Sequence, residues 1–318
     1  MKVLIYSRQK IEFWKFPRWV VEDLRSKYPE VNFEINYGED PLSEIIEDVD
    51  VLITSRLTPE EFRRAKKLRW IHSPFVGVGN MLFDELVNSP VLLTNSRGVN
   101  KEAVSTHAVA MALALIRGIP WAFHFKNERK YDHSFFTTDF IPMEPSEVKI
   151  GIMGYGEIGS SIGEKMKSLG FEVLCLTRSG SGNCFSLEQL DQFLEKIDAL
   201  IIAAPRTKEN EGIINYRRMK ILGGFLINVG RGKIVVESDL TSALKDGTLK
   251  GAALDVFEKE PLPPESPLWE IPGLIITPHT SGTSRLFWKR QKQLIEENLK
   301  LFLQGKGLKN LVNKKLGY

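Results

Sequence analysis

Three side chains suited to acid–base chemistry and anion binding each follow an expected strand in the second half of the chain. They are Arg231, Glu260 and His279, which come after residues 225–229, 252–256 and 274–277. A guanidinium binds a planar carboxylate through two parallel hydrogen bonds, and an imidazole can donate and accept a proton near neutral pH. Ligands bind at the carboxyl ends of parallel strands, so we expect these side chains to converge. Taken singly, they also suit a surface ion pair, a solvated loop and a buried core position.

Short apolar runs alternate with amphipathic segments along the chain, a pattern that predicts parallel strands joined by helices. The expected strands are residues 3–6, 31–35, 51–54, 70–72 and 91–94, and in a second series 148–153, 172–176, 199–203, 225–229, 252–256 and 274–277. Expected helices include an Ala-rich segment, 101–117, and a final long helix, 286–303. Residues 121–145 have no clear period, which indicates a loop or short helical excursion. We therefore expect an α/β protein with two doubly wound parallel-sheet domains.

A glycine-rich motif stands between the first strand of the second series and the helix after it. It reads Gly154-Tyr155-Gly156-Glu157-Ile158-Gly159. Gly154 permits a tight turn, Gly156 lets the backbone approach a pyrophosphate, and Gly159 lets the helix press onto the strand. The helix N-terminus then offers free N–H groups to the phosphates. With a strand before it and a helix after it, the motif predicts a dinucleotide site.

The usual acidic partner of this motif is missing. A carboxylate about 20 residues further on, at the end of the second strand, normally accepts a hydrogen bond from the ribose 2′-hydroxyl. Here that strand end carries Thr177, Arg178 and Ser179. Two hydroxyls and a fixed positive charge suit a 2′-phosphate, and one hydrogen bond to a charged group contributes about 1.5–3 kcal/mol. We therefore predict that NADP(H) is preferred and that NAD(H) is possible; the alternative is that Arg178 points to solvent.

Together these motifs resemble the D-isomer-specific 2-hydroxyacid dehydrogenases, and the resemblance covers essentially the whole chain. The stretches that carry it are residues 154–159, 228–232, 254–262 and 277–282. The resemblance implies a Rossmann cofactor domain inserted in a flavodoxin-like substrate domain. The cofactor domain would span residues 98–284 and form a homodimer. The substrate domain would comprise residues 1–97 and a returning C-terminal segment, 285–318.

The resemblance also implies roles for individual residues. Arg231 would bind the substrate carboxylate, His279 would be the acid/base, and Glu260 would be its carboxylate partner. A loop at residues 74–80 matches the family's substrate loop, whose backbone N–H groups also hold the carboxylate; its central residues are Val76, Gly77 and Val78. Besides the glycine motif and 177–179, the expected cofactor contacts are Ala204, Pro205, Arg206, Val229, Gly230, Arg231, Asp255, His279 and Gly282.

Two positions depart from the family pattern. Where the family often has Val-Ala-Glu-His on the Ala-rich helix, this chain has Val104-Ser105-Thr106-His107, so Thr106 replaces the Glu. Arg206 stands where the family usually has Leu, and it is either a second 2′-phosphate contact or an exposed side chain. The contacts that the Glu makes near the nicotinamide are not expected from Thr106.

The expected reaction is NADP(H)-dependent reduction of a small 2-ketoacid of the glyoxylate or hydroxypyruvate type to the D-2-hydroxyacid. Arg231 would fix the carboxylate, and His279 would protonate the carbonyl oxygen as hydride arrives. Formate and phosphite dehydrogenases share the scaffold, but formate oxidation typically has Gln where Glu260 stands. A cofactor-sensing corepressor without turnover is a further alternative. It would need disordered partner-binding tails, and none of note is evident.

Composition excludes several other classes of protein. Lys and Arg total 43 against 40 Asp and Glu, a formal net charge of +3 that is too even to predict nucleic-acid binding. No apolar stretch approaches the roughly 20 residues of a membrane span, and no signal peptide or metal site is expected. Two cysteines, Cys175 and Cys184, are too few for a disulfide framework, so we expect a reducing, cytoplasmic compartment.

Overall fold

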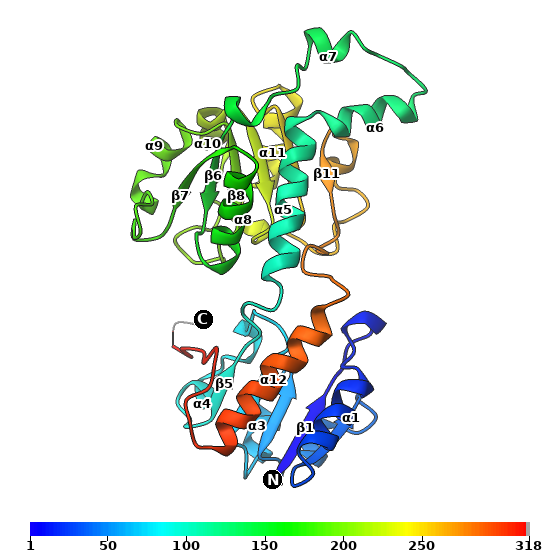
Figure 1. Ribbon diagram of the computed structural model, residues 1–318, viewed down its shortest axis with the longest axis vertical. Helices are drawn as coiled ribbons and strands as arrows, with labels where there is room; N and C mark the ends of the chain where they lie inside the picture. The colour runs from blue at the N-terminus through cyan, green and yellow to red at the C-terminus, as the bar shows by residue number, and fades with distance from the viewer. Residues whose placement is uncertain (316–318) are drawn as a thin grey trace. The chain divides into compact units, whose positions relative to one another are not determined.

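The computed structural model describes residues 1–315, which divide into two compact units. Unit 1 comprises Met1–Asn100 and the stretch that begins at Ser284, and unit 2 is Lys101–Thr283 (Figure 1). Residues 316–318, the end of the expected segment 285–318, lie outside the described residues. Each unit contains one parallel sheet with helices, as the alternating sequence pattern predicted.

Unit 1 has a five-stranded parallel sheet in the order β2-β1-β3-β4-β5. Its strands are β1 Lys2–Tyr6, β2 Asn32–Asn36, β3 Val51–Thr54, β4 Trp70–His72 and β5 Leu92–Thr94. Its helices are α1 Arg18–Lys27, α2 Leu42–Ile45, α3 Pro59–Arg64, α4 Asp84–Val87 and α12 Phe287–Leu303. This strand order is that of flavodoxin-like folds, which confirms the predicted class. Successive side chains of β1 enter different cores, so helices are needed on both faces.

Helix α12 returns to unit 1 after the long excursion of the chain through unit 2. Its apolar side, which includes Phe287, Ile295 and Leu299, joins the same core as residues of β1 and α1. The Trp288 indole N–H donates to the carbonyl oxygen of Phe13 at 2.7 Å. Burial of these side chains attaches the C-terminal segment to a sheet formed by the first hundred residues.

Unit 2 has a six-stranded parallel sheet in the order β11-β10-β9-β8-β6-β7. Its strands are β6 Lys149–Met153, β7 Glu172–Leu176, β8 Ala199–Ile202, β9 Phe225–Asn228, β10 Gly251–Leu254 and β11 Ile275–Ile276. Beyond β7, Phe185 forms a single parallel bridge with Leu176. If Phe185 is counted as a residual third strand, the order is that of a Rossmann fold, with the switch point between β6 and β8.

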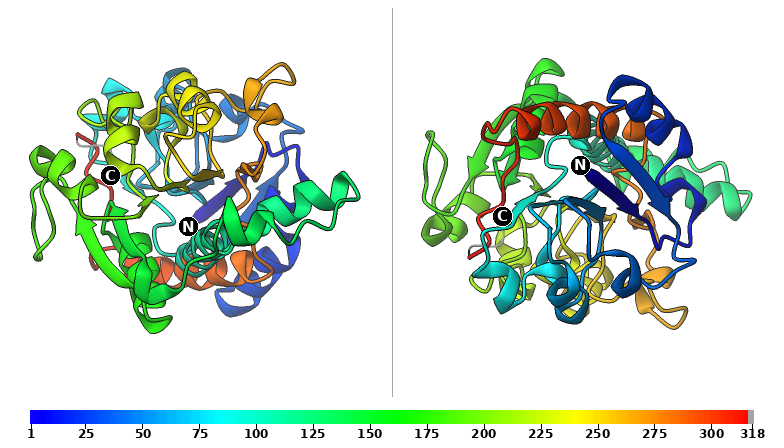
Figure 2. Two further views of the ribbon diagram at one scale, coloured as in Figure 1. Left: turned by 90° about the horizontal axis from the view of Figure 1, so that it is seen from above. Right: turned by 90° about the horizontal axis from the view of Figure 1, so that it is seen from below.

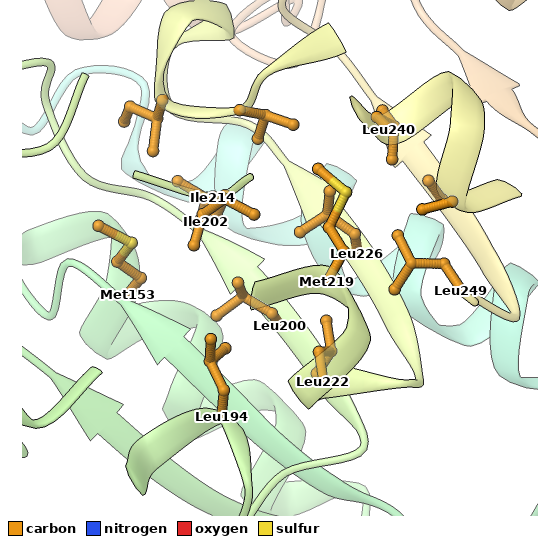
Figure 3. Close-up of a cluster of buried hydrophobic side chains, with 14 of the residues drawn as sticks. Met153, Leu194, Leu200, Ile202, Ile214, Met219, Leu222, Leu226, Leu240 and Leu249 are labelled. Atoms are coloured by element: carbon orange, nitrogen blue, oxygen red, sulfur yellow. The ribbon is translucent and has the colours of Figure 1, made fainter. Parts of the chain in front are cut away.

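Helices cover both faces of this sheet. They are α5 Lys101–Ile116, α6 Ile119–Asn127, α7 Phe135–Thr138, α8 Glu157–Ser168, α9 Leu190–Leu194, α10 Tyr216–Leu222 and α11 Glu237–Lys245. Ile150 and Ile152 of β6 pack in the core that α5 and α8 share, and Met153 enters the opposite core with residues of α9, α10 and α11. Figure 3 shows part of the latter core. The buried residues of α5 recur three and four positions apart, along one broad side of the helix.

The segment after α5 contains two short helices rather than a loop alone. Helix α6 begins after Gly118, whose φ of 67° turns the chain away from α5, and both α6 and α7 extend from unit 2 (Figures 1 and 2). Phe125, Phe135 and Phe136 pack on one another with ring centroids 5.0–6.3 Å apart. These aromatic contacts join α6 to α7, although the sequence of this segment has no regular apolar period.

The two cysteines form a single disulfide, which was not predicted from the sequence. Cys175 and Cys184 form a disulfide with their Cα atoms 4.7 Å apart. Cys175 lies on β7, and Cys184 precedes Phe185, whose N–H donates to the Cys175 carbonyl oxygen at 2.8 Å. The low cysteine number argued against a framework of several disulfides, but it carried no information on whether these two residues meet.

Within residues 1–315, no single helix is long and apolar enough to cross a membrane. Helices α5 and α6 pass the length and composition test only as a pair, and a bend of 69° separates them. Half of the side chains of α5 lie in the core of unit 2. Their hydrophobicity therefore has an explanation in packing.

Candidate active site

The residues predicted to bind the cofactor surround one edge of the unit 2 sheet. They follow the carboxyl ends of β6, β7, β8, β9, β10 and β11, as the parallel topology requires. The glycine motif follows β6, residues 177–179 follow β7, and His279 comes soon after β11. The three side chains with expected chemical roles therefore share an edge of the sheet with the dinucleotide motif.

The glycine motif has the geometry of a phosphate cradle. Gly154 has a φ of 92°, and a Cβ there would lie 2.6 Å from the backbone of Ala204. A Cβ on Gly159 would lie 2.0 Å from the carbonyl oxygen of Gly154, whereas one on Gly156 would meet no atom of residues 1–315 within 4 Å. The first and last glycines are therefore required by packing. The middle one leaves open space at the start of α8, where the helix N-terminus attracts an anion.

His279 and Glu260 form a direct pair. Nδ1 of His279 lies 2.6 Å from Oε2 of Glu260, and the other carboxylate oxygen accepts the Phe257 N–H at 3.0 Å. With Nδ1–H donating to the carboxylate, Nε2 is the ring nitrogen left to exchange a proton with a ligand. The His279 side chain is 51% exposed. Glu260 therefore orients the His279 ring through Nδ1, and about half of the side chain stays accessible to solvent.

Arg231 stands between two tightly packed glycines. A Cβ on Gly230 would lie 2.7 Å from the Ala204 carbonyl oxygen, and one on Gly232 would lie 1.9 Å from the Phe257 backbone. Desolvation lowers the pKa of the Arg231 guanidinium, while the nearby charge of Glu260 acts in the opposite direction. The side chain still reaches solvent and stays charged at neutral pH. Glycines on both sides thus let the backbone fit closely while the guanidinium extends outward.

Asp255 organises the loop that carries His279. Its side chain is fully buried, and Oδ1 accepts the Thr277 hydroxyl at 2.6 Å and the Thr280 N–H at 2.8 Å. Ser281 donates its N–H to both carboxylate oxygens, at 3.2 and 3.1 Å. The contacts of Asp255 in the structure are thus with the protein, and its predicted contact with the cofactor stays a prediction.

Sequence reasoning assigned no role to His107, although its motif was noticed. His107 Nε2 lies 3.0 Å from the Thr277 hydroxyl oxygen. Because that hydroxyl donates its proton to Asp255, it can only accept from His107, so Nε2 carries the proton. His107 therefore connects α5 to the loop of His279. Thr106, the departure from the family pattern, is exposed.

The end of β7 carries the residues predicted to select the cofactor. Thr177 Oγ1 is buried and has no hydrogen-bond partner within residues 1–315. Arg178 Nη2 lies 2.6 Å from Glu209 Oε1, so the arginine pairs with a carboxylate although its side chain is 67% exposed. Arg206 makes a longer pair with Glu211, at 3.9 Å. Arg178 follows β7 and Arg206 follows β8, on opposite sides of the switch point at which a dinucleotide binds in this fold.

The predicted substrate loop lies in unit 1, after β4. The carbonyl oxygens of Pro74, Phe75 and Val76 accept hydrogen bonds from Gln291, the Ser96 N–H and Asn95. Val76 and Gly77 are exposed, and Val78 is buried. These contacts fix the backbone of the loop, and the binding of a carboxylate by its N–H groups stays a prediction. Among residues 1–315, no group of three or more His, Cys, Asp or Glu side chains is placed to hold a metal ion.

The chain matches a known family model over more than half of its length. Residues 109–281 match the model described as "D-isomer specific 2-hydroxyacid dehydrogenase, NAD binding domain". The matched stretch contains the glycine motif, Arg231, Glu260 and His279, and it lies within unit 2.

Individual relatives agree with that match. A glyoxylate reductase of Korarchaeum cryptofilum is 30% identical over 305 residues, which cover 90% of this chain and 92% of the relative. A probable 2-hydroxyacid dehydrogenase of Rhizobium etli, solved in complex with NADP, HEPES and L(+)-tartaric acid, has a TM-score of 0.81 at 27% identity and covers 100% and 99% of the two chains. A D-isomer-specific 2-hydroxyacid dehydrogenase of Xanthobacter autotrophicus, solved with NADPH and MES, has a TM-score of 0.84 at 26% identity, with coverage of 100% and 99%.

Proposed function

Because the chain belongs to the D-isomer-specific 2-hydroxyacid dehydrogenase family, we propose that it uses NADPH to reduce a small 2-ketoacid, of the glyoxylate or hydroxypyruvate type, to the D-2-hydroxyacid. The observation that carries the proposal is the His279–Glu260 pair at the sheet edge that also holds Arg231 and the glycine motif. The similarity to a glyoxylate reductase supports the substrate class. In this assignment residues 98–284 form the cofactor domain, and residues 1–97 and 285–318 form the substrate domain.

Arg231 binds the substrate carboxylate in the proposed reaction. Its Nη1 donates to the Gly230 carbonyl oxygen at 2.7 Å, a contact that fixes the direction of the planar guanidinium. The remaining N–H groups then match the two oxygens of a carboxylate. The backbone N–H groups of Val76, Gly77 and Val78 supply further donors. Held in this way, the ketoacid keeps its carbonyl carbon in one position for reaction.

His279 supplies the proton. With Nδ1–H bound to Glu260, the protonated ring donates from Nε2 to the carbonyl oxygen of the ketoacid, and that oxygen becomes the hydroxyl of the product. The Glu260 carboxylate stabilises the positive charge of the imidazolium before the transfer. In the reverse direction, neutral His279 accepts the hydroxyl proton.

The residues present fit a nicotinamide dinucleotide, which supplies the hydride when bound. Gly156 offers open space where a pyrophosphate must approach, and Thr177 Oγ1 is a buried polar atom with no hydrogen-bond partner in the described part of the chain. The other proposed contacts follow the ends of the neighbouring strands: Ala204, Pro205, Val229, Gly230, Asp255 and Gly282. Arg178 and Ser179 favour a 2′-phosphate over a 2′-hydroxyl, with Arg206 as a second positive charge. We therefore propose that NADP(H) is preferred over NAD(H).

A panel of ketoacids tests the proposal. Glyoxylate, hydroxypyruvate, pyruvate and phenylpyruvate are each supplied with NADPH and with NADH, and the loss of nicotinamide absorbance is measured. We expect the highest kcat/KM for glyoxylate or hydroxypyruvate with NADPH. Cofactor binding without turnover of any ketoacid would favour the corepressor-like alternative, and reduction of NADP⁺ by formate or phosphite would favour the other dehydrogenases.

We also propose a cytoplasmic homodimer assembled through the cofactor domain. The segment around α6 and α7 exposes large apolar side chains on the described chain: Ile119, Phe123, Tyr131 and Ile141. Several exposed large apolar side chains in one segment are typical of an interface between subunits. Sedimentation analysis should give twice the mass of the chain, and a monomer at micromolar concentration would contradict the assembly.

A further inference from the structure

Two anchored loops bring Arg178 and Glu209 together. The loop that holds Arg178 is fastened on both sides, because Cys175 and Cys184 are bonded and the Thr177 N–H donates to the Phe185 carbonyl oxygen at 2.9 Å. The resulting contact between Arg178 Nη2 and Glu209 Oε1, at 2.6 Å, joins residues 31 positions apart in the sequence.

Glu209 belongs to a turn that follows β8 and is held by a buried asparagine. Asn210 is only 6% exposed. Its amide donates to the Pro205 carbonyl oxygen at 2.8 Å, and its side-chain oxygen accepts the Thr207 N–H at 2.7 Å. The turn therefore closes on itself and holds the backbone of Glu209 beside β7. The fold thus fixes the backbone of Glu209, and its half-exposed side chain reaches Arg178 from there.

The pair places a carboxylate, that of Glu209, beside the end of β7, where the sequence has no acidic residue. A carboxylate at this place in a Rossmann fold accepts a hydrogen bond from a ribose 2′-hydroxyl and repels a 2′-phosphate. Arg178 has the opposite preference, since a guanidinium binds a phosphate well. A bound 2′-phosphate must therefore share Arg178 with Glu209 or displace it. A 2′-hydroxyl can donate to Glu209 while the ion pair stays intact.

We propose that Glu209 is a specificity-determining residue that reduces the preference for NADPH over NADH, so that the enzyme accepts both cofactors. This inference rests on the proposed function, because it requires that the adenosine ribose binds beside Thr177 and Arg178. Glu209 lowers the affinity for NADPH through repulsion and competition for Arg178, and it raises the affinity for NADH as a hydrogen-bond acceptor.

Replacement of Glu209 by glutamine tests this role, with Glu188 as the matched control. Glu188 is also exposed, and it lies in a 3₁₀ helix, Leu187–Gln189, next to the loop of Arg178, since the Leu187 N–H donates to the Arg178 carbonyl oxygen at 3.4 Å. Glu209→Gln and Glu188→Gln each remove one negative charge from the same neighbourhood. Only the first removes the ion pair with Arg178.

The readout is the dissociation constant of NADPH and of NADH for the full chain, measured by nicotinamide fluorescence without substrate. We expect Glu209→Gln to bind NADPH about fivefold more tightly, the scale of one unit charge a few ångströms away in water, and to bind NADH more weakly. The ratio of the two constants should change at least tenfold in favour of NADPH, and Glu188→Gln should leave it within about twofold.

Two outcomes separate this inference from the proposal on which it rests. A ratio for Glu209→Gln within twofold of wild type, or an equal change in Glu188→Gln, would overturn the role of Glu209. The expected change in the ratio without turnover of any ketoacid would uphold the role of Glu209 and overturn the proposed reaction instead.

Discussion

His72 should make unit 1 sensitive to acid. It lies on β4 and is fully buried, with Nδ1 2.9 Å from the Thr94 hydroxyl oxygen and Nε2 3.5 Å from the Ser96 hydroxyl oxygen. Burial lowers the pKa of His72 from 6.5 to about 4. The folded state thus keeps the ring neutral at a pH where the unfolded chain takes up a proton. Stability from this group is full above pH 6.5 and is lost as the pH falls toward 4.

The size of the effect follows from the two pKa values of His72, 6.5 in the unfolded chain and about 4 in the folded one. Between pH 7.5 and pH 5.0, linkage gives a loss of about 2 kcal/mol in the free energy of unfolding from this residue. His72→Gln removes the titration, so its free energy of unfolding should fall less over the same interval, with a difference of about 2 kcal/mol from wild type.

Urea unfolding at the two pH values measures this difference. Tryptophan fluorescence is a suitable signal, because Trp70 is buried with its ring centroid 6.2 Å from that of His72. His133→Gln is the control, since His133 is exposed and its removal should leave the pH dependence as in wild type. If wild type and His72→Gln lose the same free energy between pH 7.5 and 5.0, the reasoning from burial is refuted.

Four further predictions concern the site and the disulfide. His279→Gln should lower kcat for ketoacid reduction about 100-fold or more, and a near-normal kcat would contradict its role as the acid. In the Glu260→Gln variant, the alkaline limb of the pH–rate profile should move to lower pH. An unmoved limb would contradict the pairing of Glu260 with His279. Arg231→Lys should raise KM and lower kcat, because a point charge cannot reproduce the planar guanidinium, and wild-type kinetics would place carboxylate binding elsewhere. Reduction of Cys175–Cys184 should lower the free energy of unfolding by about 2–3 kcal/mol, because the bond closes a loop with a sequence separation of 9 and so reduces the entropy of the unfolded chain. As the control, Cys175→Ser should make stability insensitive to dithiothreitol.

The features that could be predicted from the sequence are those with local physical causes. Parallel strands buried on both faces need continuous apolar runs, so the strand positions were recognisable to within one or two residues. The glycine motif was recognisable because a side chain at Gly154 or Gly159 would collide with backbone. A local sequence signature also marks the start of α3, where Thr58 and Glu61 form a capping box with Glu61 accepting the Thr58 N–H at 2.8 Å.

The features that escaped prediction depend on which distant segments meet. Nothing near Arg178 in the sequence indicates Glu209, because the contact depends on the turn held by Asn210. The disulfide escaped for the same reason: residue counts do not show that Cys184 lies beside β7 in a residual third strand. Long-range contacts follow from tertiary packing, which a single sequence read by local pattern does not specify.

The buried carboxylate of Asp255 connects the fold to the chemistry of His279. A charge out of contact with water is costly unless it is fully hydrogen-bonded, and here the Thr277 hydroxyl and the backbone N–H groups of Thr280 and Ser281 satisfy it. Because those donors lie on both sides of His279, Asp255 can be buried only when the loop is closed in this shape. The loop shape that stabilises the carboxylate is therefore the one that directs the His279 ring toward Glu260, so stability and the position of the acid/base have one physical cause.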